Sequence, residues 1–170
     1  ANSVSYTGAN PVFMDVSPDT WLMDEFFLDL FCLNVDLYGN PSEISSLFGL
    51  EIVDAAESIG AFTVRDFNIA CYSLNGNKTM STGSGGLVIG NDLEKVRELA
   101  DAGRVNGEYN SIGYNYRMNG MAAEMGLRQL PYLDKWVAKK RRFNQIYTEG
   151  ILVSYHPLKR NGIHPMTVCV

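Results

Sequence analysis

The centre of the chain reads Ile69-Ala-Cys-Tyr-Ser-Leu-Asn-Gly-Asn-Lys78-Thr-Met-Ser-Thr-Gly-Ser-Gly-Gly86. Its first five residues, 69–73, predict a buried strand, and the apolar run 85–90 predicts the next one. Lys78 therefore lies in a loop between two strands, just before a segment rich in Ser, Thr and Gly. The backbone amides and hydroxyls of such a loop can bind an anion, and the lysine can either screen that anion or form an imine.

Outward from this loop, predicted strands alternate with predicted helices. Apolar runs predict further strands at 11–16, 33–38 and 50–54. Apolar residues at helical spacing predict helices at 21–31, 93–100, 118–136 (with a break near Pro131) and 137–147. The first eight residues are typical of a helix that Gly8 closes. This alternation favours an α/β fold on a mainly parallel sheet flanked by helices, whose ligands gather at the carboxyl ends of the strands.

One connection is too short to hold a crossover helix. Four residues separate Phe62 from Phe67, and this spacing suits a hairpin better. Either the sheet is mixed at this point or residues are missing. The sequence also opens inside a helix pattern and closes inside the strand pattern 166–170, so we expect a fragment of a larger fold.

Composition excludes several classes of protein. The 170 residues are 46% hydrophobic and 19% charged, which is typical of a soluble globular domain. A net charge of -5 argues against binding to nucleic acid, and no apolar stretch approaches the roughly 20 residues of a membrane span. We expect a cytoplasmic protein that binds neither nucleic acid nor membrane. The three cysteines are widely spaced, so neither a disulfide framework nor a metal site is indicated: Cys32, Cys71 and Cys169.

The chemistry around Lys78 points away from a nucleotide triphosphate. The order GxxxxGK[ST] is absent, because no glycine lies five residues upstream of Gly76. An imine-forming lysine suits pyridoxal 5'-phosphate (PLP), whose pyridine ring needs a carboxylate to keep it protonated, and Asp54 follows a predicted strand. Taken singly, such an aspartate is more often a cap or turn former, and a lysine is usually solvated. Together, the two residues predict a site.

Three motifs in order add a resemblance that covers nearly the whole chain. They are Val53-Asp-Ala-Ala-Glu-Ser-Ile-Gly-Ala61, Cys71 to Gly86, and Ile112-Gly-Tyr-Asn-Tyr-Arg-Met118. The chain resembles the PLP-dependent nucleotide-sugar aminotransferases of the DegT/DnrJ/StrS type. This resemblance implies the large domain of a fold-type I PLP aminotransferase, with residues 1–150 forming an incomplete part of it and 151–170 starting the C-terminal small domain.

The resemblance also implies a role for each candidate site residue. Lys78 would form the Schiff base and move the proton between cofactor and substrate, and Asp54 would pair with the pyridine nitrogen. Glu57 would lie near the 3'-oxygen of the ring, and Ser73 would bind the phosphate. Asn115 would reach the phosphate of the neighbouring subunit, which implies a homodimer. Its neighbours are interpreted as shaping the loop through aromatic packing and a backbone-bonding arginine: Tyr114, Tyr116 and Arg117.

The implied reaction transfers an amino group, with glutamate as donor, to a keto-sugar nucleotide for surface polysaccharide or glycan biosynthesis. The Asn-Gly-Asn-Lys78 form is similar to members that aminate 4-keto-6-deoxy sugars on UDP. Related sugar 3-dehydratases carry His at the lysine position, so Lys78 disfavours that reaction. The alternative is a non-catalytic truncated or regulatory PLP-fold protein, because the family's phosphate-binding helix and ring-stacking aromatic residue would precede Ala1.

Overall fold

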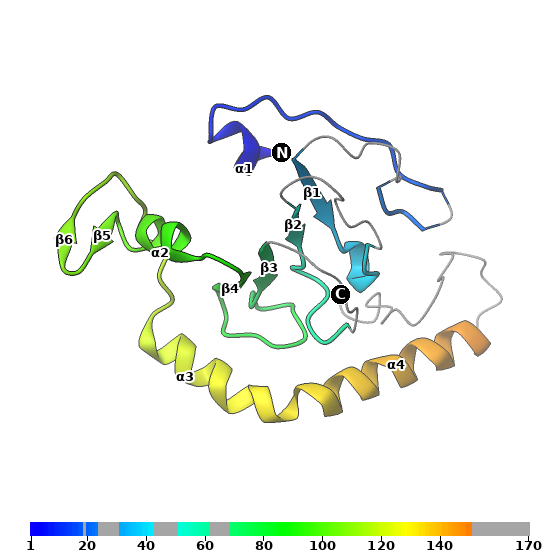
Figure 1. Cartoon of the computed structure of the whole chain (residues 1–170). Coiled ribbons are helices and arrows are strands. Elements are labelled where there is room, and N and C mark those ends of the chain that lie inside the picture. The colour runs from blue at the N-terminus through cyan, green and yellow to red at the C-terminus, as the bar shows by residue number, and fades with distance from the viewer. Residues whose placement is uncertain (19, 24–30, 43–50, 62–68, 151–170) are drawn as a thin grey trace.

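The framework of the protein is a four-stranded sheet. The computed structural model describes residues 1–18, 20–23, 31–42, 51–61 and 69–150. The strands are β1 (Cys32–Val35), β2 (Glu51–Asp54), β3 (Ile69–Ser73) and β4 (Gly86–Gly90), in that spatial order. The first three strands are parallel, and β4 is antiparallel to β3. The sheet is therefore mixed and mainly parallel (Figure 1).

The core of this sheet lies around its middle strands. Val53 and Ala70 are 0% and 1% exposed, and they form a buried cluster with Ala55, against which the partly buried Tyr72 packs. Two main-chain bonds continue the ladder past the strand ends: the Asp36 N–H donates to Asp54 O and the Ala55 N–H to Cys71 O. Because these strands are parallel, the residues that follow them all lie at one edge of the sheet.

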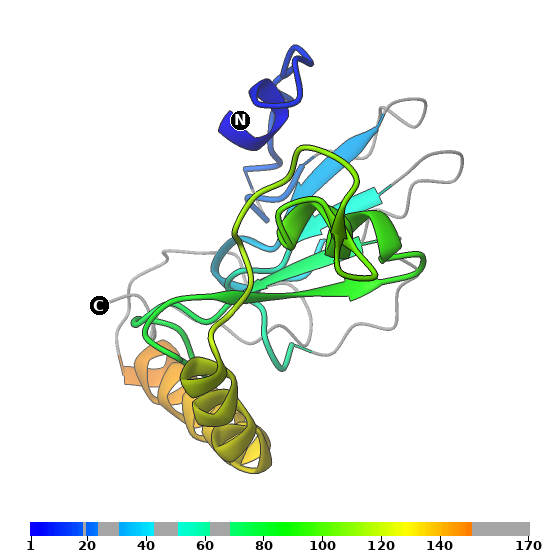
Figure 2. The same cartoon turned by 90° about the vertical axis from the view of Figure 1, so that its left-hand side faces the viewer.

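Helices lie along one side of the sheet. A long bent arm consists of α3 (Gly120–Gln129), the 3-10 turn η2 (Leu130–Tyr132) and α4 (Leu133–Gly150), and it runs below the sheet in both views (Figures 1 and 2). Asn119 caps α3, since its side chain accepts the Ala122 N–H at 2.9 Å. Pro131 lies in η2, where the two α-helices meet. No helix in the described ranges is both long enough and apolar enough to cross a membrane.

The remaining elements are short. They are α1 (Asn2–Ser5), the 3-10 turn η1 (Leu37–Gly39), α2 (Glu94–Ala100) and the hairpin of β5 (Arg104–Val105) and β6 (Glu108–Tyr109). Gly8 follows α1 with a φ of 81° and donates its N–H to Ser5 O, as expected for a closing glycine. α2 and the β5–β6 hairpin lie beyond β4 (Figure 1).

Most of the predicted elements are confirmed, including the strands near 33, 50, 69 and 85 and the helix break near Pro131. The strand predicted at 11–16 is wrong. Val16 makes only an isolated bridge with Met23, and Val12 and Phe13 are 73% and 79% exposed. An apolar run becomes a strand only where a neighbour accepts its hydrogen bonds, and no strand of the described sheet pairs with this segment.

Two predictions concern the connections around the sheet. The short connection between Phe62 and Phe67 lies outside the described residues, as do most of the predicted helix 21–31 and all of 151–170. The strands on either side of that connection, β2 and β3, are parallel neighbours and not a hairpin. The mixed character of the sheet instead arises one strand later, where β4 reverses direction after the loop that carries Lys78.

Candidate active site

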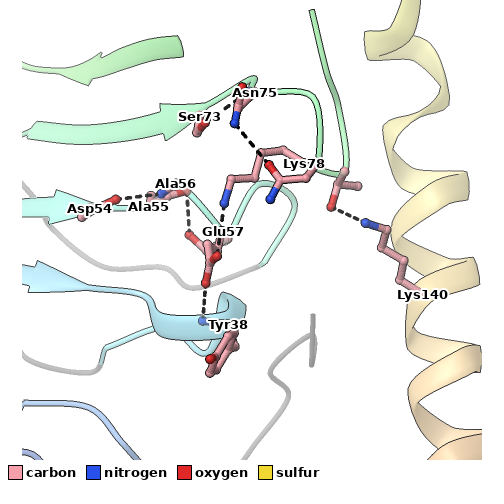
Figure 3. Close-up of polar contacts among 12 residues, drawn as sticks. Tyr38, Asp54, Ala55, Ala56, Glu57, Ser73, Asn75, Lys78 and Lys140 are labelled. Carbon is pink, nitrogen blue, oxygen red and sulfur yellow. Dashed lines mark hydrogen bonds and ion pairs between the residues drawn. The ribbon is translucent and has the colours of Figure 1, made fainter. Parts of the chain in front are cut away.

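Three predicted site residues lie at the carboxyl edge of the parallel strands. Asp54 is the last residue of β2, Ser73 is the last residue of β3, and Lys78 lies in the loop that follows β3. The register pairs Asp54 with Cys71, so neighbouring strands end close to the same level. Parallel topology therefore brings a carboxylate, a hydroxyl and an amine to one edge of the sheet (Figure 3).

Lys78 and Glu57 form an ion pair at this edge. The Lys78 Nζ lies 3.1 Å from Glu57 Oε1, and the two side chains are 13% and 22% exposed. Glu57 Oε2 accepts the main-chain N–H of Tyr38 at 2.9 Å. Figure 3 shows Glu57 between Lys78 and Tyr38, so a single carboxylate connects the lysine loop to the η1 turn after β1. Because each carboxylate oxygen binds a different partner, the orientation of the carboxylate toward the amine is fixed.

Asp54 and Ser73 each organise a turn within their own chain segment. Asp54 Oδ1 accepts the Ala56 N–H at 3.1 Å, and Ser73 Oγ accepts the Asn75 N–H at 3.2 Å. The first bond is the turn-forming use of aspartate, and it engages one carboxylate oxygen. In the second bond the serine hydroxyl is an acceptor, so its own proton is available to donate to an anion.

Asn115 belongs to a different part of the fold. Its segment forms an antiparallel bridge with Asp101 at the end of α2, and the neighbouring Tyr114 exchanges main-chain bonds with Leu99 and Ala102. The side chain of Asn115 is exposed, and none of the described contacts joins it to Asp54, Ser73 or Lys78. The structure therefore brings together four of the predicted site residues and leaves Asn115 outside them.

The neighbours of Asn115 shape its loop, with one correction. Tyr114 and Tyr116 stack with ring centroids 4.9 Å apart, which agrees with the expected aromatic packing. Arg117 was expected to bond the backbone, but its Nε lies 2.7 Å from Asp101 Oδ1. That prediction is wrong because Asp101, at the end of α2, presents a carboxylate to the guanidinium, and a charged acceptor attracts it more strongly than a carbonyl.

The charge of Asp54 also acts on its neighbour in β3. Burial, and secondly the negative charge of Asp54, raise the pKa of the Cys71 thiol above its usual range. Neither Cys71 nor Cys32 forms a disulfide. Within the described ranges, no three His, Cys, Asp or Glu side chains are grouped so that they could hold a metal ion. The carboxyl edge carries the amine of Lys78 and three carboxylates, those of Asp36, Asp54 and Glu57.

Comparison with known proteins identifies the family. The sequence pattern of the DegT/DnrJ/EryC1/StrS aminotransferase family matches residues 1–158. The chain belongs to this family. It is 32% identical to a GDP-perosamine synthase of Escherichia coli O157:H7, over 96% of this chain and 52% of that protein. It is 34% identical to a GDP-perosamine synthase of Caulobacter vibrioides, over 84% of this chain and 45% of that protein. The chain thus spans about half the length of these relatives.

Solved structures of the family agree with the fold. The crystal structure of DesV from S. venezuelae superposes with a TM-score of 0.78 at 26% identity, over 89% of this chain and 47% of that one. The mixed, mainly parallel sheet with flanking helices is therefore the fold-type I sugar aminotransferase fold, of which this chain spans about half. The expected family and fold class are both confirmed.

The residues at the carboxyl edge fit the PLP of DegT/DnrJ/EryC1/StrS aminotransferases. PLP carries an aldehyde, a ring nitrogen and a phosphate, which require an amine, a carboxylate and hydrogen-bond donors. Lys78 presents a primary amine that a carboxylate orients. Asp54 retains a second carboxylate oxygen besides the one in its turn, and Ser73 retains a hydroxyl proton. Each functional group of the cofactor thus has a matching group at this edge.

Two contacts of the Lys78 loop were not predicted from the sequence. The side chain of Gln129, in α3, bonds the main chain of Ser81, and Lys140, in α4, donates to Thr79 Oγ1 at 2.9 Å. Apolar spacing predicted both helices but gave no information on their polar side chains. The side of each helix that faces the loop cannot be read from the sequence, so no residue pattern identifies either contact.

Proposed function

We propose that the protein transfers an amino group from glutamate to a keto-sugar nucleotide, with PLP attached to Lys78. The observation that carries this proposal is the ion pair of Lys78 and Glu57, at the edge where Asp54 and Ser73 also end their strands. A largely buried amine held by a carboxylate, beside a second carboxylate and a hydroxyl, matches the needs of PLP chemistry. Membership in the aminotransferase family supports the reaction class.

Each residue has a distinct proposed role. When bound, PLP supplies an aldehyde for attachment and a protonated ring that withdraws electrons from the reacting carbon. Asp54 holds the proton on the ring nitrogen, and Ser73 donates its hydroxyl proton to the phosphate. Lys78 Nζ would carry the proton between the substrate carbon and the cofactor carbon. Glu57 accepts a hydrogen bond from that amine and so aims it.

Chemical trapping tests the role of Lys78. The purified protein is incubated with PLP, reduced with borohydride and mapped by peptide mass spectrometry, and we expect the pyridoxyl group on Lys78. A Lys78→Ala variant should lose the label, whereas a Lys95→Ala variant should keep it, because the Lys95 side chain is 64% exposed on α2. A label on a different lysine would refute the assignment. Absence of any label would favour the non-catalytic alternative.

Substitution of Asp54 tests its proposed role at the ring nitrogen. An Asp54→Ala variant should slow the half-reaction with glutamate by about 100-fold or more, since it removes a charge-stabilising group from the reacting centre. Retention of PLP should change much less, because the lysine and the phosphate contacts persist. Single-turnover absorbance measurements follow both quantities, and near-normal turnover would contradict the role proposed for Asp54.

The proposed sugar substrate is a 4-keto-6-deoxy sugar linked to a nucleotide, used in surface polysaccharide or glycan biosynthesis in the cytoplasm. The Asn-Gly-Asn-Lys78 form favours a UDP sugar, while the relatives named GDP-perosamine synthase favour a GDP-linked sugar. A panel of UDP- and GDP-linked keto sugars, each with glutamate or alanine as donor, tests these choices. If neither the UDP-linked nor the GDP-linked 4-keto-6-deoxy sugar is aminated, the proposed substrate class is rejected.

The proposed assembly is a homodimer in which Asn115 contributes to the partner's site. Asn115 is exposed and lies apart from Lys78 in its own chain, which is what a residue acting across an interface requires. The test uses mixed dimers of wild type with an Asn115→Ala/Lys78→Ala double variant. If Asn115 acts across the interface, the intact lysine loses its asparagine and PLP binds more weakly. Unchanged PLP affinity in isolated mixed dimers would reject the shared site.

A further inference from the structure

The loop that carries Lys78 is closed at its base. The Thr82 N–H donates to Leu74 O and the Leu74 N–H donates to Gly85 O, both at 2.9 Å, and Leu74 is 1% exposed. Within the loop, the Lys78 N–H donates to Asn75 O at 3.0 Å. These bonds anchor the base and the first turn of the loop. The segment between Lys78 and Thr82 is contacted by side chains of α3 and α4.

Gln129 supplies one of these contacts through both ends of its side-chain amide. Its Oε1 accepts the Ser81 N–H at 3.1 Å, and its Nε2 donates to Ser81 O at 2.6 Å. The two groups lie 48 residues apart in the sequence. One side chain therefore satisfies both main-chain groups of a residue located three positions after Lys78, as a neighbouring strand would do.

Neighbouring positions on the helical arm contact adjacent residues of the same loop. Gly126, one turn before Gln129, is buried, and a Cβ at this position would lie 3.3 Å from Thr82 Cγ2. From α4, Lys140 Nζ donates to Thr79 Oγ1 at 2.9 Å, and Figure 3 shows this lysine reaching from the helix toward the loop beside Lys78. The absence of a side chain at Gly126 lets the helix approach closely enough for the Gln129 amide to reach the main chain.

We propose that Gln129 is a positioning residue for Lys78, an inference that rests on the proposed function of Lys78 as the PLP-binding lysine. By fixing the main chain at Ser81, Gln129 restricts the loop so that the Lys78 amine stays aimed toward Glu57 and the cofactor. Displacement of a reacting group by about 1 Å is enough to slow a reaction severely. Gln129 itself touches neither the amine nor the reacting atoms in this role.

Two variants and a matched control test the proposal in the purified protein. Gln129→Met keeps the length of the side chain but removes both hydrogen bonds to Ser81. Reduction with cyanoborohydride traps PLP on Lys78, and the amount trapped over time gives the attachment rate. We expect this rate to fall about 10-fold in the variant, as the loss of two neutral hydrogen bonds predicts. Exchange of the Ser81 amide hydrogen should become faster by a similar factor. The control is Arg128→Met, because Arg128 is 79% exposed and pairs with Glu124 on the helix surface.

A Gln129→Glu variant gives a pH profile that a general loss of folding would not produce. A protonated glutamic acid can donate to Ser81 O and accept the Ser81 N–H, so it reproduces both bonds. The ionised form loses the donor and repels the carbonyl. The attachment rate relative to wild type should therefore be highest at low pH, where the carboxyl group is protonated. It should fall by about 10-fold as the pH rises through the ionisation of this carboxyl group, whose ordinary pKa is about 4.3.

The outcomes separate this inference from the function on which it rests. Equal attachment rates in wild type and Gln129→Met would overturn the positioning role alone. If Gln129→Met does not fold, Gln129→Glu decides, and a rate ratio that does not change with pH overturns the proposal. Absence of PLP attachment at Lys78 in wild type as well would reject the proposed function, and the positioning role with it.

Discussion

The ion pair of Lys78 and Glu57 predicts a measurable loss of stability when its charge is removed. The two atoms are 3.1 Å apart and the side chains are 13% and 22% exposed, so water and salt screen the pair only weakly. A hydrogen bond between charged groups contributes about 1.5–3 kcal/mol. Glu57→Gln removes the charge and leaves one acceptor oxygen for two donors, the Lys78 amine and the Tyr38 N–H. We expect the free energy of unfolding to fall by about 1.5–3 kcal/mol.

The assay is urea unfolding of the PLP-free protein in a double-mutant cycle. The cycle combines Glu57→Gln with Lys78→Met, and we expect an interaction energy of at least about 1 kcal/mol between the two positions. The control cycle uses Glu124 and Arg128, an i,i+4 pair on the surface of α3 whose side chains are 57% and 79% exposed. Such exposed pairs contribute about 0.3–0.5 kcal/mol. Additive effects at Glu57 and Lys78, within about 0.3 kcal/mol, would refute the coupling inferred from the geometry.

Two further predictions concern the strands and the Asn115 loop. Because burial and Asp54 raise the pKa of Cys71, its neutral thiol stabilises the fold below the ordinary thiol pKa of 9.0, and stability is lost as the pH rises through the higher folded value. Asp54→Asn should therefore speed alkylation of Cys71 at pH 8. Because burial remains, the reaction should still be slower than that of an exposed thiol. An unchanged alkylation rate, measured by mass spectrometry, would contradict this account. A Cβ at Gly113 would lie 2.2 and 2.8 Å from main-chain atoms of segment 99–103, so Gly113→Ala should destabilise by about 1–3 kcal/mol or more. Gly120→Ala, at a helical position with nothing within 4 Å, should stabilise by about 0.4–1 kcal/mol, and urea unfolding that ranks the two variants the other way would contradict the packing at Gly113.

Local patterns were sufficient to predict most elements of this fold. The strand 69–73 and the helices on either side of Pro131 have apolar residues at the period of their own secondary structure, and the structure contains them. The strand predicted at 11–16 had the same local pattern, but pairing depends on a distant partner, which composition does not reveal. For the same reason, the sequence predicted a mainly parallel sheet without identifying β4 as its reversed strand.

Motifs located the candidate site more completely than they described its contacts. Asp54 and Lys78 were predicted to form a site because residues that follow parallel strands share an edge, and Ser73 was added by the family resemblance. The structure places all three at this edge. The pairing of Glu57 with Lys78 depends on the conformation of two turns, which residue types do not determine. The contact of Gln129 with Ser81 was even harder to predict. Gln129 bonds the main chain of Ser81, and every residue has the same main-chain groups.

The separation of Ser81 and Gln129 in the sequence also sets the order in which contacts form while the chain is being synthesised. A nascent chain that has released residues up to the end of β4 contains all the strands of the four-stranded sheet, and it can close the base of the Lys78 loop. The contacts from α3 and α4 lie 48 and 61 residues downstream of their partners, so they form only after the ribosome has released the helical arm. Emergence of this arm therefore determines when the loop becomes rigid, and a ribosome paused before Gln129 would hold a chain whose lysine is present but not yet held in place.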